Sequence, residues 1–194
     1  MIYKTRYNSS QGAALGPLGF LIIANLIVFI VTLVRPALIY DLGLSQSNFL
    51  SQPWTILTNM FVHASFGHIF GNMLTLYFYG SYLINLVGER DFFLVYFIGG
   101  LMGNIAYLLM ASPFTIAIGA SGAVFAIGAA LMVLRPKLTV YLFPLPVPLP
   151  LWVVVIGGFL ILMSPGIAWQ AHLGGLAFGA VAGLYLRRKP RLYF

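Results

Sequence analysis

The chain has 194 residues, of which 61% are hydrophobic and 7% are charged. Soluble domains carry about 25% charged residues, so this composition excludes an ordinary soluble domain and indicates a membrane protein. The net charge of +7 does not indicate nucleic acid binding, because the basic residues flank apolar segments and are best explained as residues that orient a membrane protein. The absence of cysteine excludes disulfide bonds and thiolate chemistry.

Six apolar runs of about 20 residues follow one another along the chain and predict six transmembrane helices. In chain order they cover residues 17–34, 66–87, 92–111, 116–134, 148–163 and 168–186. No polar linker divides them, so residues 1–194 are predicted to form a single all-α domain, a polytopic six-helix bundle. Residues 36–62, between the first two runs, are too polar to cross the bilayer yet keep apolar side chains such as Trp54. We expect this segment to lie in the outer interface.

Basic residues gather at one face of this arrangement. By the positive-inside rule that face is cytoplasmic, and an even number of spans agrees with both termini lying there. The expected location is the plasma (inner) membrane of a multi-pass protein. The outer face keeps only Arg35, whereas the cytoplasmic face has Lys4, Arg6, Arg90, Arg135, Lys137, Arg187, Arg188, Lys189 and Arg191.

Four polar side chains are predicted to lie at a similar depth below the outer surface. His68 and Asn72 are four residues apart and share a face near the start of the second run. Ser121 and His172 lie near the starts of the fourth and sixth runs. All three runs are expected to begin at the outer face, so the topology alone brings these side chains to one level.

Small residues predict that the fourth and sixth helices touch. Steps of 3, 7 and 11 residues return to nearly the same helical face, so His172 shares its face with three glycines. Gly122 begins a comparable small face on the fourth helix, and small faces let helix backbones approach closely. The three glycines are Gly175, Gly179 and Gly183.

That contact predicts nucleophilic catalysis. A serine hydroxyl becomes a good nucleophile when a neutral imidazole within hydrogen-bond distance takes its proton. The charge that develops on a substrate carbonyl needs fixed donors, which the Asn72 amide, the His68 ring and the Ser121 backbone N–H can provide. No carboxylate falls within the six runs, so the predicted machinery is a serine–histidine dyad.

The chain resembles the rhomboid family of intramembrane serine proteases. The resemblance rests on His63, then His68-Ile69-Phe70-Gly71-Asn72, then Gly119-Ala120-Ser121-Gly122, then Ala171-His172-Leu173-Gly174-Gly175. It implies a serine endopeptidase that cleaves single-pass transmembrane proteins in the bilayer without metal or cofactor, with a half-embedded outer loop after the first helix. It also suggests substrates with helix-destabilising residues and a small residue at the cut.

The resemblance assigns roles by position. Ser121 is the expected nucleophile and His172 the general base, with His68, Asn72 and the Ser121 backbone as oxyanion donors. Gly119, Gly122 and Phe125 are expected to support the site, and His63 is expected to be structural. Two positions depart from the common bacterial pattern: Thr55 follows Trp54 where many relatives carry Trp-Arg, and Phe125 stands where a tyrosine often packs on the histidine. We expect these departures to affect stability or rate rather than to abolish the chemistry.

Three other functions compete with this prediction. A metal site built from His63, His68 and His172 is conceivable, but the chain lacks His-Glu-x-x-His and any intramembrane carboxylate or thiolate. A small transporter is a second alternative, although the polar residues cluster in the outer half of the membrane only. A non-catalytic relative that binds membrane proteins is the third, and its usual mark is loss of the serine or histidine, both of which are present.

Overall fold

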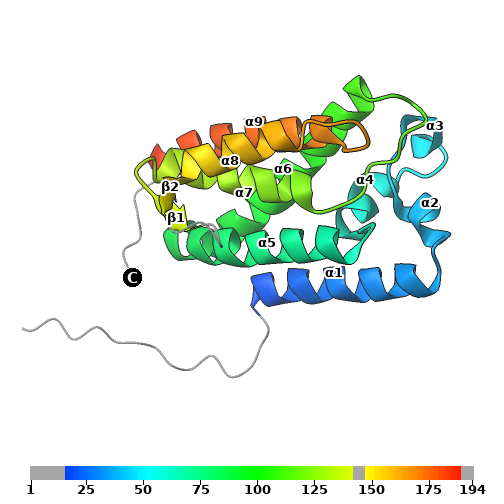
Figure 1. The fold of residues 1–194 in the computed structure, drawn as a ribbon, viewed down its shortest axis with the longest axis horizontal. Coiled ribbons are helices and arrows are strands. Elements are labelled where there is room, and N and C mark those ends of the chain that lie inside the picture. The colour runs from blue at the N-terminus through cyan, green and yellow to red at the C-terminus, as the bar shows by residue number, and fades with distance from the viewer. Residues whose placement is uncertain (1–15, 142–146, 189–194) are drawn as a thin grey trace, which may run out of the picture.

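The computed structural model describes residues 16–141 and 147–188, and this part of the chain is mostly helical (Figure 1). Each of the six predicted runs contains one long helix, and the first two match the predicted bounds at both ends. Of the described helices, α1 and α6 are long and apolar enough to cross a membrane by themselves. The six helices are α1 (Pro17–Val34), α5 (Phe66–Val87), α6 (Glu89–Met110), α7 (Ser121–Leu134), α8 (Leu151–Ile161) and α9 (Trp169–Arg188).

Four short helices form the segment between α1 and α5, at one end of the bundle (Figure 1). They are α2 (Leu38–Leu42), α3 (Gln46–Phe49), α4 (Thr55–Thr58) and the 3-10 helix η1 (Asn59–Phe61). Side chains tie these turns together: the Trp54 indole N–H donates to the Asp41 carbonyl at 2.9 Å, and the Thr58 hydroxyl donates to the Leu42 carbonyl at 2.8 Å. Thr55, one of the two departures noted above, is buried and donates to the Gln52 carbonyl.

Three predicted helix starts differ from the structure by three residues or more. Residues 116–120 are not helical, because Ala117 pairs with Leu44 in an antiparallel bridge and Gly119 has a φ of 115° that a helix does not accept. Residues 148–150 form strand β2 (Pro148–Pro150) and pair with β1 (Thr139–Tyr141). Helix α6 begins at Glu89 rather than at residue 92, so its two acidic residues lie in the first turn, where they complement the helix dipole.

Helix α7 lies at the centre of the fold and is the most thoroughly buried of the long helices. It contacts α5, α6, α8 and α9. Ile127 and Leu131 pack into the main hydrophobic core with Leu76 of α5 and Tyr96 of α6. Because α7 begins at Ser121, this packing fixes where the serine backbone lies.

Helices α7 and α9 form the most extensive contact between elements, as the glycine pattern predicted. A Cβ on Gly175 would collide with the carbonyl of Gly122, and a Cβ on Gly179 would collide with the carbonyl of Ala126. No larger side chain fits at either position without separating the backbones. The glycines therefore hold α9 against α7 along the length that carries His172.

Helix α6 takes part in the same close packing, which the sequence analysis missed. A Cβ on Gly103 would lie 2.5 Å from the Ala171 carbonyl oxygen of α9, and a Cβ on Gly99 would collide with the Ala126 side chain of α7. Gly99 and Gly103 are four residues apart, the spacing typical of tight helix pairs in membranes. The sequence therefore carried a signal that α6 packs closely against other helices.

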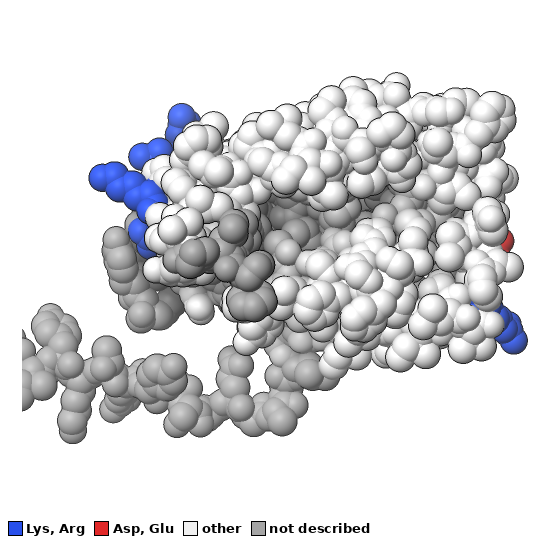
Figure 2. All heavy atoms as spheres, in the orientation of Figure 1, with Lys and Arg blue, Asp and Glu red and all other residues white. Residues whose placement is uncertain are grey.

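The described basic residues lie mainly at one end of the molecule (Figure 2). Arg187 and Arg188 end α9, and Arg135 follows α7. Arg35 follows α1, whose C-terminal end lies at the opposite end of the bundle (Figure 1). This distribution agrees with the predicted charge asymmetry for the described residues, whereas Lys4, Arg6, Lys189 and Arg191 lie outside them.

Candidate active site

Ser121 and His172 are hydrogen-bonded neighbours. The Ser121 Oγ atom lies 2.7 Å from the His172 Nε2 atom, although the two residues are 51 positions apart in the chain. Ser121 is the first residue of α7 and His172 lies in the first turn of α9, so two helices that begin at the same end of the bundle bring them together. A hydroxyl and an imidazole in this geometry are able to exchange a proton.

The His172 ring is buried and held by its neighbours. Its side chain is 3% exposed, and the Phe125 ring packs on it with 4.8 Å between ring centroids and a 34° interplanar angle. A phenyl group at this position therefore keeps the ring contact that a tyrosine makes, without a hydroxyl. Within the described part of the chain, the buried Nδ1 atom has no hydrogen-bond partner. The three acidic residues lie elsewhere, in α2 and in the first turn of α6.

The His68 ring lies beside the loop that precedes Ser121. The Ala64 backbone N–H donates to His68 Nδ1 at 3.4 Å, so Nδ1 accepts and the proton of the neutral ring is on Nε2. A Cβ on Gly119 would lie 2.7 Å from that Nε2 atom, so only glycine fits between the two. Gly119 is thus required both by its positive φ and by the approach of His68.

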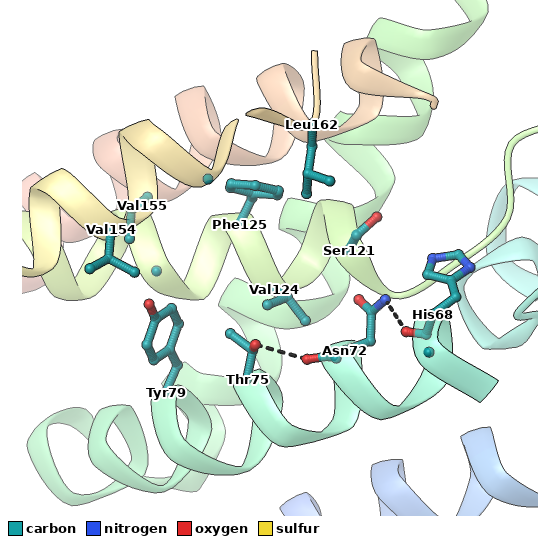
Figure 3. Close-up of a pocket in the computed structure, with 14 residues that line it drawn as sticks. His68, Asn72, Thr75, Tyr79, Ser121, Val124, Phe125, Val154, Val155 and Leu162 are labelled. Atoms are coloured by element: carbon teal, nitrogen blue, oxygen red, sulfur yellow. Dashed lines mark hydrogen bonds between the residues drawn. The ribbon is translucent and has the colours of Figure 1, made fainter. Parts of the chain in front are cut away.

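Asn72 lies one turn after His68 on the same face of α5. Its side-chain Nδ2 donates one hydrogen to the His68 carbonyl at 2.9 Å (Figure 3), and the amide has a second hydrogen to donate. His68, Asn72 and Ser121 all line one pocket. The structure therefore brings the predicted donors of α5 to the same cavity as the serine.

Three residues hold the loop before Ser121, and the sequence analysis missed one of them, Asn59. The Gly119 N–H donates to the Asn59 carbonyl at 2.8 Å, and the Ala120 N–H donates to His63 Nε2 at 3.4 Å. Asn59 and Asn104 exchange two side-chain hydrogen bonds, of 2.9 and 2.8 Å. A polar residue in an apolar run predicts interhelical hydrogen bonding, which Asn104 makes, whereas Asn59 carries no signal in its local sequence.

His63 is neutral at physiological pH. Burial, with a smaller contribution from the nearby His68, lowers the pKa of His63 to about 4. The neutral ring accepts from Ala120 through Nε2 and therefore has its proton on Nδ1, which lies 3.3 Å from the Phe61 carbonyl. His63 supports the loop, as its expected structural role requires.

We expect Asn104→Leu to destabilise the protein by about 1–3 kcal/mol, because it leaves the buried Asn59 amide without its partner. Thermal unfolding in detergent measures this change. The double variant N59L/N104L should be less destabilised than the sum of the single variants, since both amides are then removed together. Additive effects would show that the two amides do not stabilise one another.

The pocket has a volume of about 400 Å³ and runs between α5, α7 and α8 (Figure 3). Its walls are mainly apolar, with His68 and Asn72 near Ser121 and with Thr75 and Tyr79 further along α5 (Figure 3). Behind Ser121 lies a second cavity of about 10 Å³, close to the space that one water molecule needs. This cavity is lined in part by Asn59, Asn104 and Ser121.

Comparisons with known proteins found sequence relatives. A family model described as the Rhomboid domain matches residues 50–189. RHOMBOID-like protein 12, mitochondrial, of Arabidopsis thaliana is 34% identical over 87% of this chain and 57% of its own length. Rhomboid protein 1, mitochondrial, of Saccharomyces cerevisiae is 29% identical over 75% of this chain and 45% of its own.

Some relatives are named as proteases. Rhomboid protease GluP of Bacillus subtilis is 30% identical over 74% of this chain, and the match covers 28% of GluP. The chain spans about half the length of the two mitochondrial relatives that it matches.

Proposed function

We propose that this chain, which belongs to the rhomboid family, is a serine endopeptidase that cleaves transmembrane segments of other proteins within the bilayer. The observation that carries the proposal is the 2.7 Å contact between Ser121 Oγ and His172 Nε2 at the end of a pocket. An interhelical hydrogen bond alone would not account for the donors on α5 that line the same cavity.

The proposed reaction has two stages. Ser121 Oγ attacks the scissile carbonyl carbon while His172 Nε2 takes the hydroxyl proton, and His172 then gives that proton to the departing amine. The C–N bond breaks and an ester forms between Ser121 and the substrate acyl group. Water then attacks the ester, with His172 again accepting and returning a proton, and the serine is regenerated.

The negative oxygen that forms in both stages requires donors. His68 Nε2–H and the free amide hydrogen of Asn72 are the side chains that we assign to it. The Ser121 backbone N–H joins them, because the first N–H groups of a helix have no partner within the helix. Preorganised donors of this kind typically accelerate acyl transfer by about 10²–10³-fold each.

Water is the second reactant. Because the surroundings are apolar, the proposed mechanism needs a place where a water molecule can bind near Ser121. The cavity of about 10 Å³ behind Ser121 has amide groups in its lining and is the position that we assign to a water molecule beside the nucleophile. Asn59 and Asn104 would then hold both the loop and the water.

The proposed placement in the membrane follows from the charges. The six long helices cross the bilayer, with the basic end in the cytoplasm and Ser121 near the outer surface. Residues 36–62 lie half-embedded in the outer interface, where the half-exposed Trp54 indole is suited to the headgroup level. The plasma (inner) membrane is the proposed location, and single-pass membrane proteins are the proposed substrates.

A fluorophosphonate probe tests the proposal directly, because it reacts with an activated serine. Purified protein in detergent is expected to be labelled at Ser121, and His172→Ala should abolish labelling by removing the base. His68→Ala and Asn72→Ala should slow labelling, since the phosphonate oxygen takes the place of the oxyanion. Absence of labelling in the folded parent would refute the proposal and favour a non-catalytic relative that binds membrane proteins.

A further inference from the structure

A groove lies between α6 and α9, apart from the candidate active site. Its volume is about 620 Å³, and among the described residues it shares no lining residue with the pocket that contains Ser121. Apolar side chains make up most of its walls, including Leu94 and Ile98 of α6 and Phe178 and Val181 of α9. The proposed reaction uses none of these residues, so the groove needs an explanation of its own.

The groove is about as deep as one leaflet of a bilayer. On α6 its lining runs from Arg90 to Ile98, and on α9 from Leu186 back to Phe178, which is a step of eight residues on each helix. Eight residues extend about 12 Å along a helix axis. One leaflet is half of the hydrocarbon core of about 30 Å. An acyl chain that enters at the helix ends therefore meets apolar walls along most of its leaflet.

The apolar walls alone do not select a ligand. Leu94 is 45% exposed and Val181 is 64% exposed. Exposed apolar side chains are ordinary on a surface that faces lipid, because lipid tails are as apolar as leucine. The charged residues at the mouth of the groove decide the class of ligand.

Two arginines lie at this mouth. Arg90 lines the groove and is exposed. Arg188 is the last residue of α9 and is also exposed. It follows Val181 by seven residues and Tyr185 by three, so the helical repeat places it on the groove side of α9. Both helix walls of the groove thus end in a guanidinium group.

One carboxylate belongs to the same mouth. Asp91 lines the groove, whereas the Glu89 carboxylate lies toward the start of α1, where a Cβ on Gly16 would be 3.9 Å from its Oε1 atom. Two arginines against one carboxylate leave the mouth positive, at the end of the molecule where the described basic residues gather (Figure 2). Basic pockets between membrane helices on the cytoplasmic side are typical sites for anionic lipid headgroups.

We propose that the α6–α9 groove binds an anionic phospholipid of the cytoplasmic leaflet, with its phosphate at Arg90 and Arg188 and an acyl chain along Leu94 and Val181. This goes beyond the proposed protease function and requires only the proposed placement of the basic end at the cytoplasmic surface. A zwitterionic lipid fills the groove equally well but offers no net charge to the arginines. A second copy of this chain, paired through the same face, would bring its own arginines to the same level.

Native mass spectrometry of the purified protein in a zwitterionic detergent tests the proposal. The probes are phosphatidylglycerol and phosphatidylcholine with identical acyl chains. The parent should bind phosphatidylglycerol about fivefold or more tightly than phosphatidylcholine, since one basic residue at an anionic surface contributes about this factor. Arg90→Gln and Arg188→Gln should each remove about fivefold of the affinity for phosphatidylglycerol and leave the affinity for phosphatidylcholine unchanged.

The matched control is Arg187→Gln, which removes the same charge from the same turn of α9. Arg187 is exposed and follows Phe178 by nine residues, so it lies on the side of the helix opposite to the groove. This variant should keep the parental preference. An equal loss in all three variants would overturn the site, because the attraction would then come from the general charge of this end.

Two further results would also overturn the proposal. Equal affinities of the parent for the two lipids would mean that the arginines do not select the headgroup. Competition by glycerol phosphate at the same concentration as the lipid would mean that the groove walls do not contribute, and that the site takes a free phosphate. Fluorophosphonate labelling of Ser121 is a separate measurement, so failure of the lipid site would leave the protease proposal intact.

Discussion

Under the proposed function, Ser121→Ala is expected to reduce cleavage of a labelled transmembrane substrate by about 10³-fold or more, because it removes the proposed nucleophile. His172→Ala should cause a loss of similar order, since the proposed base and nucleophile would act as one unit. Their contact of 2.7 Å is the reason for expecting them to fail together rather than additively. The measurement compares initial rates for purified parent and variants in liposomes.

The control for this experiment is Ser81→Ala, which removes a hydroxyl from α5 well away from Ser121. Ser81 is partly exposed and lies in the last third of the helix. This variant should cleave at the parental rate. If Ser121→Ala or His172→Ala cleaves at the parental rate, the dyad assignment is incorrect.

Gly179→Ala is expected to destabilise the protein by about 1–3 kcal/mol or more, although only one methyl group is added. The new Cβ would lie 2.7 Å from the carbonyl carbon of Ala126, and a backbone atom has no rotamer by which to move away. Helix α9 would have to shift from α7, which would also lengthen the Ser121–His172 contact. Thermal unfolding in detergent should therefore show a lower midpoint together with reduced activity.

Gly157→Ala is the matched control, and its effect on stability should have the opposite sign. Its Cβ meets nothing within 4 Å, and alanine is favoured over glycine in a helix interior by about 1 kcal/mol. The variant should be as stable as the parent or slightly more so. If Gly179→Ala behaves like Gly157→Ala, the two helices are not held by close backbone contact.

Local patterns in the sequence were sufficient to locate the long helices and to single out Ser121 and His172 as candidates. An uninterrupted apolar run is a property of the segment itself, so the bounds of α1 and α5 were predicted at both ends. The expectation that Ser121 and His172 lie near the starts of two helices followed from their positions in two apolar runs. The glycine spacing after His172 then indicated which helix it faces.

Features that depend on distant partners were not predictable in the same way. Residues 116–120 are as apolar as a helix, but the pairing of Ala117 with Leu44 decides their conformation. Asn59 has no local signal, because its role depends on Asn104 and on the loop at Gly119. At Gly71 and Gly158 a Cβ would meet no described atom within 4 Å, yet in the sequence these two look like the packed Gly175 and Gly179.

The sequence by itself determined which segments are apolar, which end of each carries the polar groups, and which residue types are available for chemistry. These depend on composition and on helical periodicity, which are local. The tertiary structure decided which glycines meet a neighbouring backbone and which open onto a cavity, and how closely Ser121 and His172 approach. Those outcomes depend on differences of a few tenths of an ångström in the separation of helices that are far apart in the chain. No periodicity in the sequence encodes such differences.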